Sequence, residues 1–360
     1  MRIPFFIASV LLAGFVQAQT VVKKFTIPAG LTEISGMVAY NGGWLVHGDG
    51  GAPPALFVIN DKGNVTDTFN IAAVNNDWED LAENNNTYFI GDFGNNTGTR
   101  KDLKIYMLRK DSIHIQGYKP EILNFSFADQ TDFSSSQFTD FDCEAMAAVG
   151  DTLYIFSKSK ASGVCRIYKT PAITGNSKIA VFDTLQFPFW ATGAAYSGNR
   201  LYVVGYSPNW DMSLNPWLYT TDMVNGKINH KGARVYPLSV TGSKQTEAVN
   251  VGLNGKLYVS AEAYRQDSAT MYEVTLPAAK AYSVIYRSDI LKPNPVISEV
   301  YYTGPDAFCT YTLFNSGGIK MMQGEFSENK RLDLGLLCSG IYLLKTEGVS
   351  GCRFVRIVKL

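Results

Sequence analysis

Five residues with oxygen-bearing side chains recur at one position of a repeated motif, and together they could bind a cation. They are Ser35, Glu79, Glu144, Thr192 and Glu247. Three carboxylates and two hydroxyls are hard ligands, which suit Ca²⁺ better than Zn²⁺ or copper. Three carboxylates around one axis repel each other, so they need protons or a cation. The set therefore predicts a Ca²⁺ site, provided that the fold brings the five side chains together.

The spacing of the copies predicts the elements that would position these residues. After each first residue comes a short apolar run, a turn and a second apolar run, and the copies start 44, 65, 48 and 55 residues apart. A period of this length, made of strands, is typical of a β-propeller. We predict an all-β chain with a five-bladed β-propeller, in which each first residue opens the innermost strand of its blade. All five side chains would then meet at one mouth of the central tunnel.

The segments around the same mouth carry residues that could take part in catalysis. The candidates are Asp77, Asp80, Asp92, Arg100, Lys158 and Lys160. One of the three aspartates could act as a general base, and the three cations could offset the charge of a phosphate. Ca²⁺ would polarise a phosphoryl oxygen or a bound water.

No pair of a base and a nucleophile can be identified, so two functions stay open. The first is a binding or scaffold module whose Ca²⁺ is structural. The second is a Ca²⁺-dependent hydrolase of phosphate esters. The extracellular ligand or substrate is not identified by the sequence in either case.

The runs between the motifs predict the remaining strands of the blades. Residues 21–27 are predicted to close the ring as the outer strand of the last blade, which removes two open sheet edges. Residues 179–185 are predicted as the outer strand of blade three, and residues 282–286 have no clear place in blade five. Trp78 could stack on a ligand at the mouth or wedge between two blades, and we favour the wedge.

The N-terminal residues indicate export. Arg2, an apolar run from Ile3 to Val16 and a small-residue cleavage site ending at Ala18 are typical of a signal peptide. The run is too short to span a bilayer, and no later segment is long and apolar enough. A net charge of zero gives no electrostatic reason to expect nucleic acid as a partner. We expect a secreted or cell-surface monomer.

Composition changes at Lys292-Pro293-Asn294-Pro295, and the sequence divides into a signal peptide (1–18), a propeller (19–291) and a small C-terminal β-sandwich (292–360). The tail resembles the C-terminal sorting domain of the type IX secretion system of Bacteroidetes. The matching elements are Pro293-Asn294-Pro295, Leu313-Phe314-Asn315-Ser316-Gly317-Gly318, Leu334-Gly335-Leu336-Leu337, Ser339-Gly340-Ile341-Tyr342 and Arg356-Ile357-Val358-Lys359. This resemblance implies that the secretion machinery is a partner. It also implies export across the outer membrane, followed by cleavage of the tail or surface attachment. The alternative is a small sandwich with a binding role.

Residues 30–265 resemble a family of secreted bacterial β-propellers that is grouped with phytase-like and esterase-like propellers, a grouping that implies no particular activity. The matching motifs are Asp77-Trp78-Glu79-Asp80-Leu81-Ala82, Ile90-Gly91-Asp92-Phe93-Gly94-Asn95-Asn96, Asp142-Cys143-Glu144-Ala145-Met146, Thr192-Gly193-Ala194 and Gln245-Thr246-Glu247-Ala248-Val249. A fainter similarity is to calcium-activated nucleotidases (apyrases). These are five-bladed propellers whose tunnel calcium is held in the order Ser-Glu-Glu-Ser-Glu. Here the order is Ser-Glu-Glu-Thr-Glu, which keeps the hydroxyl and implies a tunnel Ca²⁺.

Overall fold

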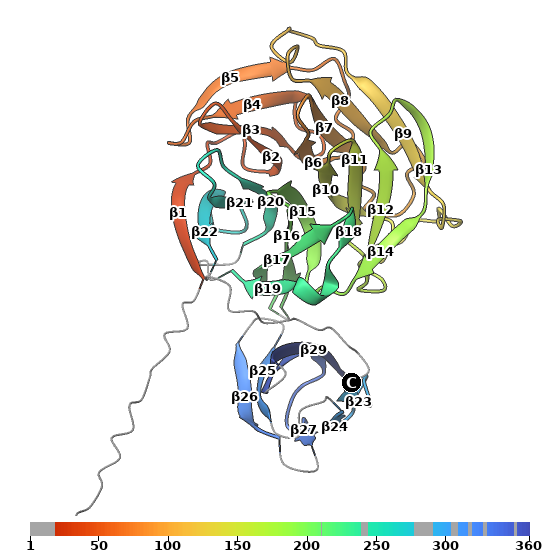
Figure 1. Ribbon diagram of the computed structural model, residues 1–360, viewed down its shortest axis with the longest axis vertical. Coiled ribbons are helices and arrows are strands. Elements are labelled where there is room, and N and C mark those ends of the chain that lie inside the picture. The colour runs from red at the N-terminus through yellow and green to blue at the C-terminus, as the bar shows by residue number, and fades with distance from the viewer. Residues whose placement is uncertain are drawn as a thin grey trace, which may run out of the picture.

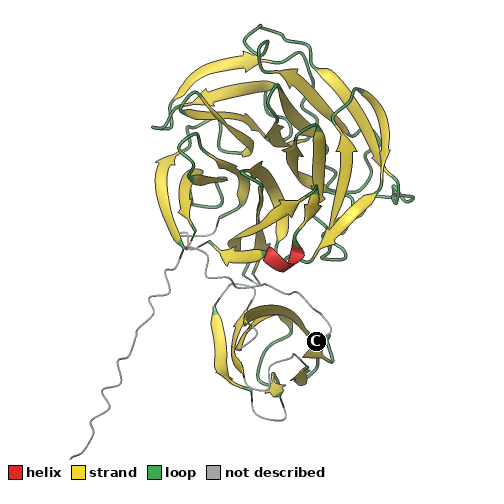
Figure 2. Ribbon diagram, viewed as in Figure 1, coloured by secondary structure: helices red, strands yellow, loops and turns green. Residues whose placement is uncertain are grey.

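The structure is a computed structural model that describes residues 19–209, 211–238, 244–276, 291–303, 309–315, 319–326, 330–348 and 351–360. Within these ranges the chain is built from β-strands, with a short 3₁₀-helix at His230–Gly232 (Figure 2). None of the described helices is long and apolar enough to cross a membrane. The predicted signal peptide and residues 282–286 lie outside the described residues.

Five sheets surround a central axis (Figure 1), as predicted for a five-bladed propeller. The first blade contains β2 (Ile34–Tyr40), β3 (Gly43–Gly48), β4 (Ala55–Ile59) and β5 (Val65–Asn70). The second contains β6 (Trp78–Glu83), β7 (Thr87–Asp92), β8 (Lys104–Arg109) and β9 (Glu121–Phe127). The third contains β10 (Cys143–Val149), β11 (Thr152–Ser157), β12 (Cys165–Pro171) and β14 (Val181–Leu185). The fourth contains β15 (Trp190–Ser197), β16 (Arg200–Pro208), β17 (Leu214–Val224), β18 (Lys227–Ile228) and β19 (Arg234–Pro237).

The last blade combines both ends of the propeller. Its strands β20 (Thr246–Val251), β21 (Leu257–Ala261) and β22 (Thr270–Thr275) are joined on the outside by β1 (Thr20–Thr26). The pairing of β1 with β22 is antiparallel and runs from Thr20 opposite Thr275 to Thr26 opposite Thr270. The prediction of a closing N-terminal strand is therefore confirmed, and the ring has no break between its first and last blades.

The outer edge of the second blade differs from the prediction. We expected residues 179–185 as one strand of the third blade, but only β14 belongs there. Residues of β13 (Gly175–Ile179) instead pair in parallel with β9 of the neighbouring blade, from Gly175 opposite Leu123 to Ile179 opposite Phe127. This extra strand covers an edge that would otherwise present unpaired backbone groups. A short apolar run cannot reveal that a strand has crossed to the next blade.

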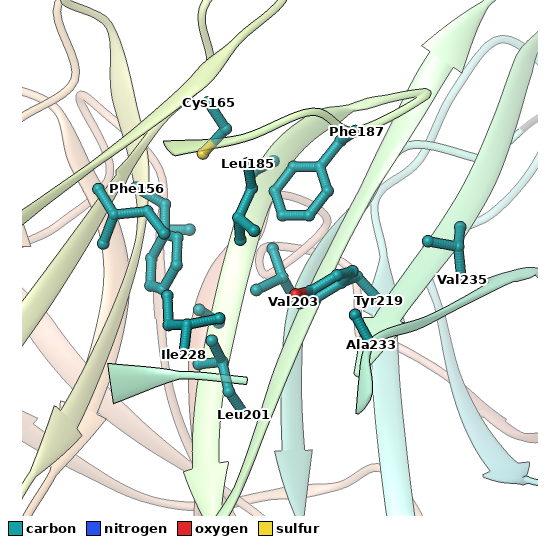
Figure 3. Close-up of a cluster of buried hydrophobic side chains, with 14 of the residues drawn as sticks. Phe156, Cys165, Leu185, Phe187, Leu201, Val203, Tyr219, Ile228, Ala233 and Val235 are labelled. Atoms are coloured by element: carbon teal, nitrogen blue, oxygen red, sulfur yellow. The ribbon is translucent and has the colours of Figure 1, made fainter. Parts of the chain in front are cut away.

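Apolar side chains fill the spaces between neighbouring blades. Between the third and fourth blades, Phe156, Leu201, Val203 and Tyr219 are buried in one cluster (Figure 3). Between the first and second blades, the Trp78 ring is fully buried and contacts the His47 ring edge-on, with 5.4 Å between the ring centroids. Its indole nitrogen donates a hydrogen bond to the Val74 carbonyl. Trp78 is thus a wedge between blades, as favoured from the sequence.

The C-terminal residues form two further sheets around their own core. One contains β23 (Leu291–Lys292), β24 (Glu299–Tyr302) and β27 (Arg331–Asp333). The other contains β26 (Lys320–Glu325), β25 (Cys309–Asn315), β28 (Gly340–Gly348) and β29 (Gly351–Lys359). Val300, Leu313, Leu344 and Ile357 are buried between them. This arrangement is the small β-sandwich that was predicted.

Candidate functional site

The five motif residues share a backbone irregularity that the sequence did not reveal. Each innermost strand loses register with its neighbour at the motif residue, so that the strand carries an extra residue there. The extra residue is Ser35 in β2, Glu144 in β10, Thr192 in β15 and Glu247 in β20, whereas in β6 the irregularity spans Glu79 and Asp80. A β-bulge re-aims a side chain relative to a regular strand. Irregularities at the same point of all five inner strands therefore place the motif residues at corresponding positions around the axis.

All five side chains are buried. Glu144, Thr192 and Glu247 lie in the half of the ring that contains the cation of Lys158. The Lys158 ammonium, which follows β11, lies 2.5 Å from the Glu144 carboxylate and 5.2 Å above the Tyr206 ring. Burial alone would lower the pKa of Lys158, but Glu144 raises it well above its usual range. Burial raises the pKa of Glu247, and the charge of Lys158 partly offsets this rise. The Thr192 hydroxyl donates a hydrogen bond to the Thr246 carbonyl.

The other half of the ring carries carboxylates without a cation. Oxygens of Asp49, Asp77 and Glu79 all lie within 4.8 Å of one another. Glu79 is only 6 % exposed. Within the described parts of the chain, the carboxylates of Glu79 and Asp77 have neither a hydrogen-bond donor nor an ion-pair partner. A Cβ at Gly94 would overlap oxygens of both side chains, so the glycine leaves room for this cluster.

Electrostatics within the cluster disfavour three negative charges. Burial raises the pKa of Glu79 well above its usual range, and Glu144 and Asp49 raise it further. Burial also raises the pKa of Asp77 to about 6, with Asp49 adding to the effect. Protons or a cation must compensate such a group near neutral pH. Three hard oxygen ligands, with water completing the shell, suit Ca²⁺.

The candidate cations near the mouth already have carboxylate partners, one of which is the candidate base Asp92. The Arg100 guanidinium lies 2.8 Å from the buried Asp92 carboxylate, and Lys104 is 3.7 Å from its second oxygen. The Lys160 ammonium lies 2.9 Å from Asp142 and also donates to the Asn96 side chain. Together with the pair of Lys158 and Glu144, these contacts give each of the three predicted phosphate-binding cations a carboxylate partner.

Asp80 was predicted at the tunnel mouth, but its carboxylate is buried among backbone N–H groups of three blades. Its Oδ2 accepts hydrogen bonds from the backbone N–H groups of Met146 in β10 (2.7 Å) and Ala194 in β15 (2.9 Å). Its Oδ1 accepts from the N–H of Leu81 at 2.8 Å. One buried carboxylate thus connects three blades across the axis. These contacts occupy the oxygens that a general base would need.

Asp49 was not among the predicted ligands or catalytic candidates, and Lys158 was predicted to offset a phosphate charge rather than to pair with Glu144. Asp49 follows β3, and Lys158 follows β11, so both occupy the position directly after the second strand of a blade. That position returns to the mouth beside the bulged residue, which makes both side chains neighbours of the axis. The repeat predicted this placement, but the sequence could not show that Asp49 joins Glu79 or that Lys158 neutralises Glu144.

Comparisons with known proteins do not assign the chain to a family. No protein-family model matches the chain, and no curated protein matches it. A solved glucose dehydrogenase is 10% identical, covering 72% of this chain and 100% of its own, with a TM-score of 0.45. The endo-arabinase from Bacteroides thetaiotaomicron is 13% identical, covering 71% of this chain and 99% of its own, with a TM-score of 0.43. A WD40 β-propeller domain is 14% identical, covering 66% and 62%, with a TM-score of 0.32.

Proposed function

We propose that this protein is an extracellular β-propeller binding module with a Ca²⁺ ion at one mouth of its tunnel. The observation that carries the proposal is the group formed by Asp49, Asp77 and Glu79, whose oxygens lie within 4.8 Å of one another. Buried carboxylates without a cation destabilise the fold, whereas a bound Ca²⁺ would turn the same group into a link between the first two blades. The ion has a structural role in this proposal.

The ligand set differs from the ring expected from the motif. Glu79 is common to both sets. Glu144 faces Lys158 at 2.5 Å, which supplies a positive charge where the expected ring would have placed the ion. Asp49 and Asp77 supply the remaining carboxylates on the side of Glu79. We infer that the ion lies off the axis, towards the first two blades.

The same contacts favour a binding module over a phosphate-ester hydrolase. A hydrolase of this kind needs cations that are free to meet the substrate and a carboxylate that is free to take a proton. Here Arg100, Lys158 and Lys160 each have a carboxylate partner. Asp80 and Asp92 are buried and bonded to other groups. Asp77, the third candidate base, is one of the proposed Ca²⁺ ligands, and ligation would occupy its carboxylate.

Export is the second part of the proposal. The signal-peptide pattern of residues 1–18 and the sorting-domain resemblance of residues 292–360 support secretion through the type IX machinery, with a secreted or cell-surface destination. Expression with and without residues 292–360 in a bacterium that has this machinery would test it. We expect the full chain outside the cell and the truncated chain in the periplasm. Equal export of both would contradict the role of the tail.

The cation site is tested on the mature full chain, from residue 19 to residue 360. Calorimetric titration of metal-stripped protein with Ca²⁺ should give one strong site, and saturating Ca²⁺ should raise the melting temperature. The variants Asp77→Asn and Glu79→Gln remove one ligand charge each and should weaken Ca²⁺ binding by at least about tenfold.

Asp67→Asn is the matched control, because Asp67 is an exposed carboxylate on β5 outside the cluster. It should leave the Ca²⁺ affinity unchanged. The same samples are assayed with a generic phosphate ester and a nucleoside diphosphate. Tight binding without turnover supports the binding module. Turnover that requires Ca²⁺ and is lost in Glu79→Gln would replace it by the hydrolase.

A further inference from the structure

A cavity lies at the end of the tunnel opposite the carboxylate cluster. At this end, hairpins join the first two strands of each blade. The cavity volume is about 870 Å³, and all five blades contribute to its wall. The side chains that matter below are Tyr40, Tyr88, Tyr196, Asn85, Asn86 and Leu253. Asn84 at the hairpin end is five residues beyond Glu79, which corresponds to about 16 Å along a strand. The cavity is therefore separate from the carboxylate cluster.

Two charged residues of this cavity pair with each other, and a third is hydrogen-bonded to an amide. Lys110 is paired with Glu83, and its ammonium lies 4.7 Å above the Tyr88 ring. Asp151 accepts a hydrogen bond of 3.0 Å from the Asn84 side chain. None of these charged side chains, all of them in the described residues, is left without a partner. An anionic ligand would have to take Lys110 from Glu83 and would face the Asp151 carboxylate, so the cavity favours a neutral ligand over an anionic one.

The cavity offers the aromatic rings of the partly exposed Tyr40 and Tyr196 together with amide and hydroxyl groups, whereas the Tyr88 ring is buried beneath Lys110. Tyr40, Tyr88 and Tyr196 come from three different blades. Within the described residues, the hydroxyls of Tyr40 and Tyr88 and the amides of Asn85 and Asn86 make no hydrogen bond. Amides and hydroxyls both donate and accept hydrogen bonds, and tyrosine adds an apolar ring face. This combination matches a sugar ring, which has polar hydroxyls at its edge and C–H groups on its faces.

We propose that the hairpin-end cavity binds a neutral oligosaccharide. The volume lies in the range of ligand sites in proteins, about 300 to 1,000 Å³, and it accommodates a few sugar units. Leu253 is 73 % exposed on the β20–β21 turn and forms part of the rim. The site supplies a ligand class for the binding module and does not depend on the cation at the other mouth.

The test titrates the mature full chain with cellohexaose, xylohexaose, mannohexaose and arabinohexaose, followed by calorimetry and NMR. We expect at least one hexasaccharide to bind with a Kd between about 10 μM and 1 mM. Tyr196→Ala should weaken that binding by about tenfold, as expected for the loss of one aromatic contact. Leu253→Arg changes an exposed turn residue and should weaken it as well, without loss of folding.

Two controls separate this site from the cation site. Tyr301→Ala removes an exposed tyrosine of the C-terminal sandwich and should leave sugar binding unchanged. Glu79→Gln should also leave it unchanged, even if it abolishes Ca²⁺ binding. The proposal is overturned if no hexasaccharide binds at about 10 mM, or if Tyr196→Ala and Leu253→Arg both bind as tightly as the wild type. Preference for an oligogalacturonate over all four neutral sugars would also overturn it.

Discussion

The ammonium of Lys158 lies 2.5 Å from the carboxylate of Glu144, and both side chains are almost completely buried at the tunnel mouth. The lysine belongs to the third blade, so the protein itself supplies this cation. It pairs with Glu144 and partly offsets the charge of Glu247, while no lysine or arginine of the described residues forms an ion pair with Asp49, Asp77 or Glu79 on the other side. The mouth thus divides into a half that holds an internal cation and a half whose described carboxylates lack one.

Removing the internal cation should destabilise the propeller strongly. In Lys158→Met the buried Glu144 charge loses its partner, which typically costs about 3 to 5 kcal/mol of unfolding free energy. Urea unfolding followed by circular dichroism measures the change. Lys256→Met is the matched control, because its ammonium is exposed beside Glu273 and the change should stay below about 1 kcal/mol. The double variant Lys158→Met/Glu144→Leu should regain much of the loss. A single variant as stable as the wild type would contradict the ion pair.

The stability of the metal-stripped protein should fall as the pH rises from about 4 to about 7. Burial raises the pKa of Asp77 to about 6 and that of Glu247 to about 7. The folded state therefore holds these protons more tightly than the unfolded state, and this stabilisation is lost as the pH passes through the raised pKa values. Melting temperatures at several pH values measure the trend. Saturating Ca²⁺ should reduce it, because the bound ion favours the ionised carboxylates. A melting temperature that rises as the pH increases from about 4 to about 7 would contradict the prediction.

Asp80 should be needed for stability. In Asp80→Ala the N–H groups of Leu81, Met146 and Ala194 lose their acceptor, and each buried unsatisfied group costs about 1 to 3 kcal/mol. We expect a total loss of about 3 kcal/mol or more. Asp80→Asn keeps one acceptor oxygen and should lose less. The exposed Asp67→Ala is the control, with a change within about 0.5 kcal/mol. If instead Asp80→Ala unfolds at the wild-type urea concentration, the bracing role is wrong.

Trp78 should matter through packing between the first two blades. Trp78→Ala removes a fully buried ring and should cost about 3 to 5 kcal/mol, as for other large core truncations. Phe138→Ala removes an aromatic side chain that is 74 % exposed and should change stability little. Guanidinium unfolding of the two variants provides the comparison. Equal stability of both would show that Trp78 is not a wedge.

The repeat predicted the propeller because its signal is periodic and occurs five times. The inner strands, the hairpins and the closing strand all follow from alternating runs between turn residues. The parallel strand β13 was missed because pairing between blades depends on tertiary contacts. Residues 175–179 carry no pattern that distinguishes a strand in blade three from one on the edge of blade two.

The candidate site could be predicted only in outline. The types and spacing of Ser35 and Glu79 indicated an oxygen-rich mouth, and their burial agrees with that. The sequence could not show which carboxylates share a cation and which have a lysine, because that depends on side chains from different blades. Asp80 illustrates the same limit. It is adjacent to Glu79 in sequence, yet its side chain accepts hydrogen bonds from two other blades.

The pairing of β1 with β22 also determines when the propeller ring can close during synthesis and folding. Thr20 is among the earliest residues of the propeller to be synthesised, and its partner Thr275 is among the last. Contacts between such distant parts of a chain form slowly, because a long loop must close before they are made. Until residues 270–275 are available, β1 has no strand to join. A nascent or truncated chain that ends earlier would therefore expose an unpaired edge on which other chains could assemble.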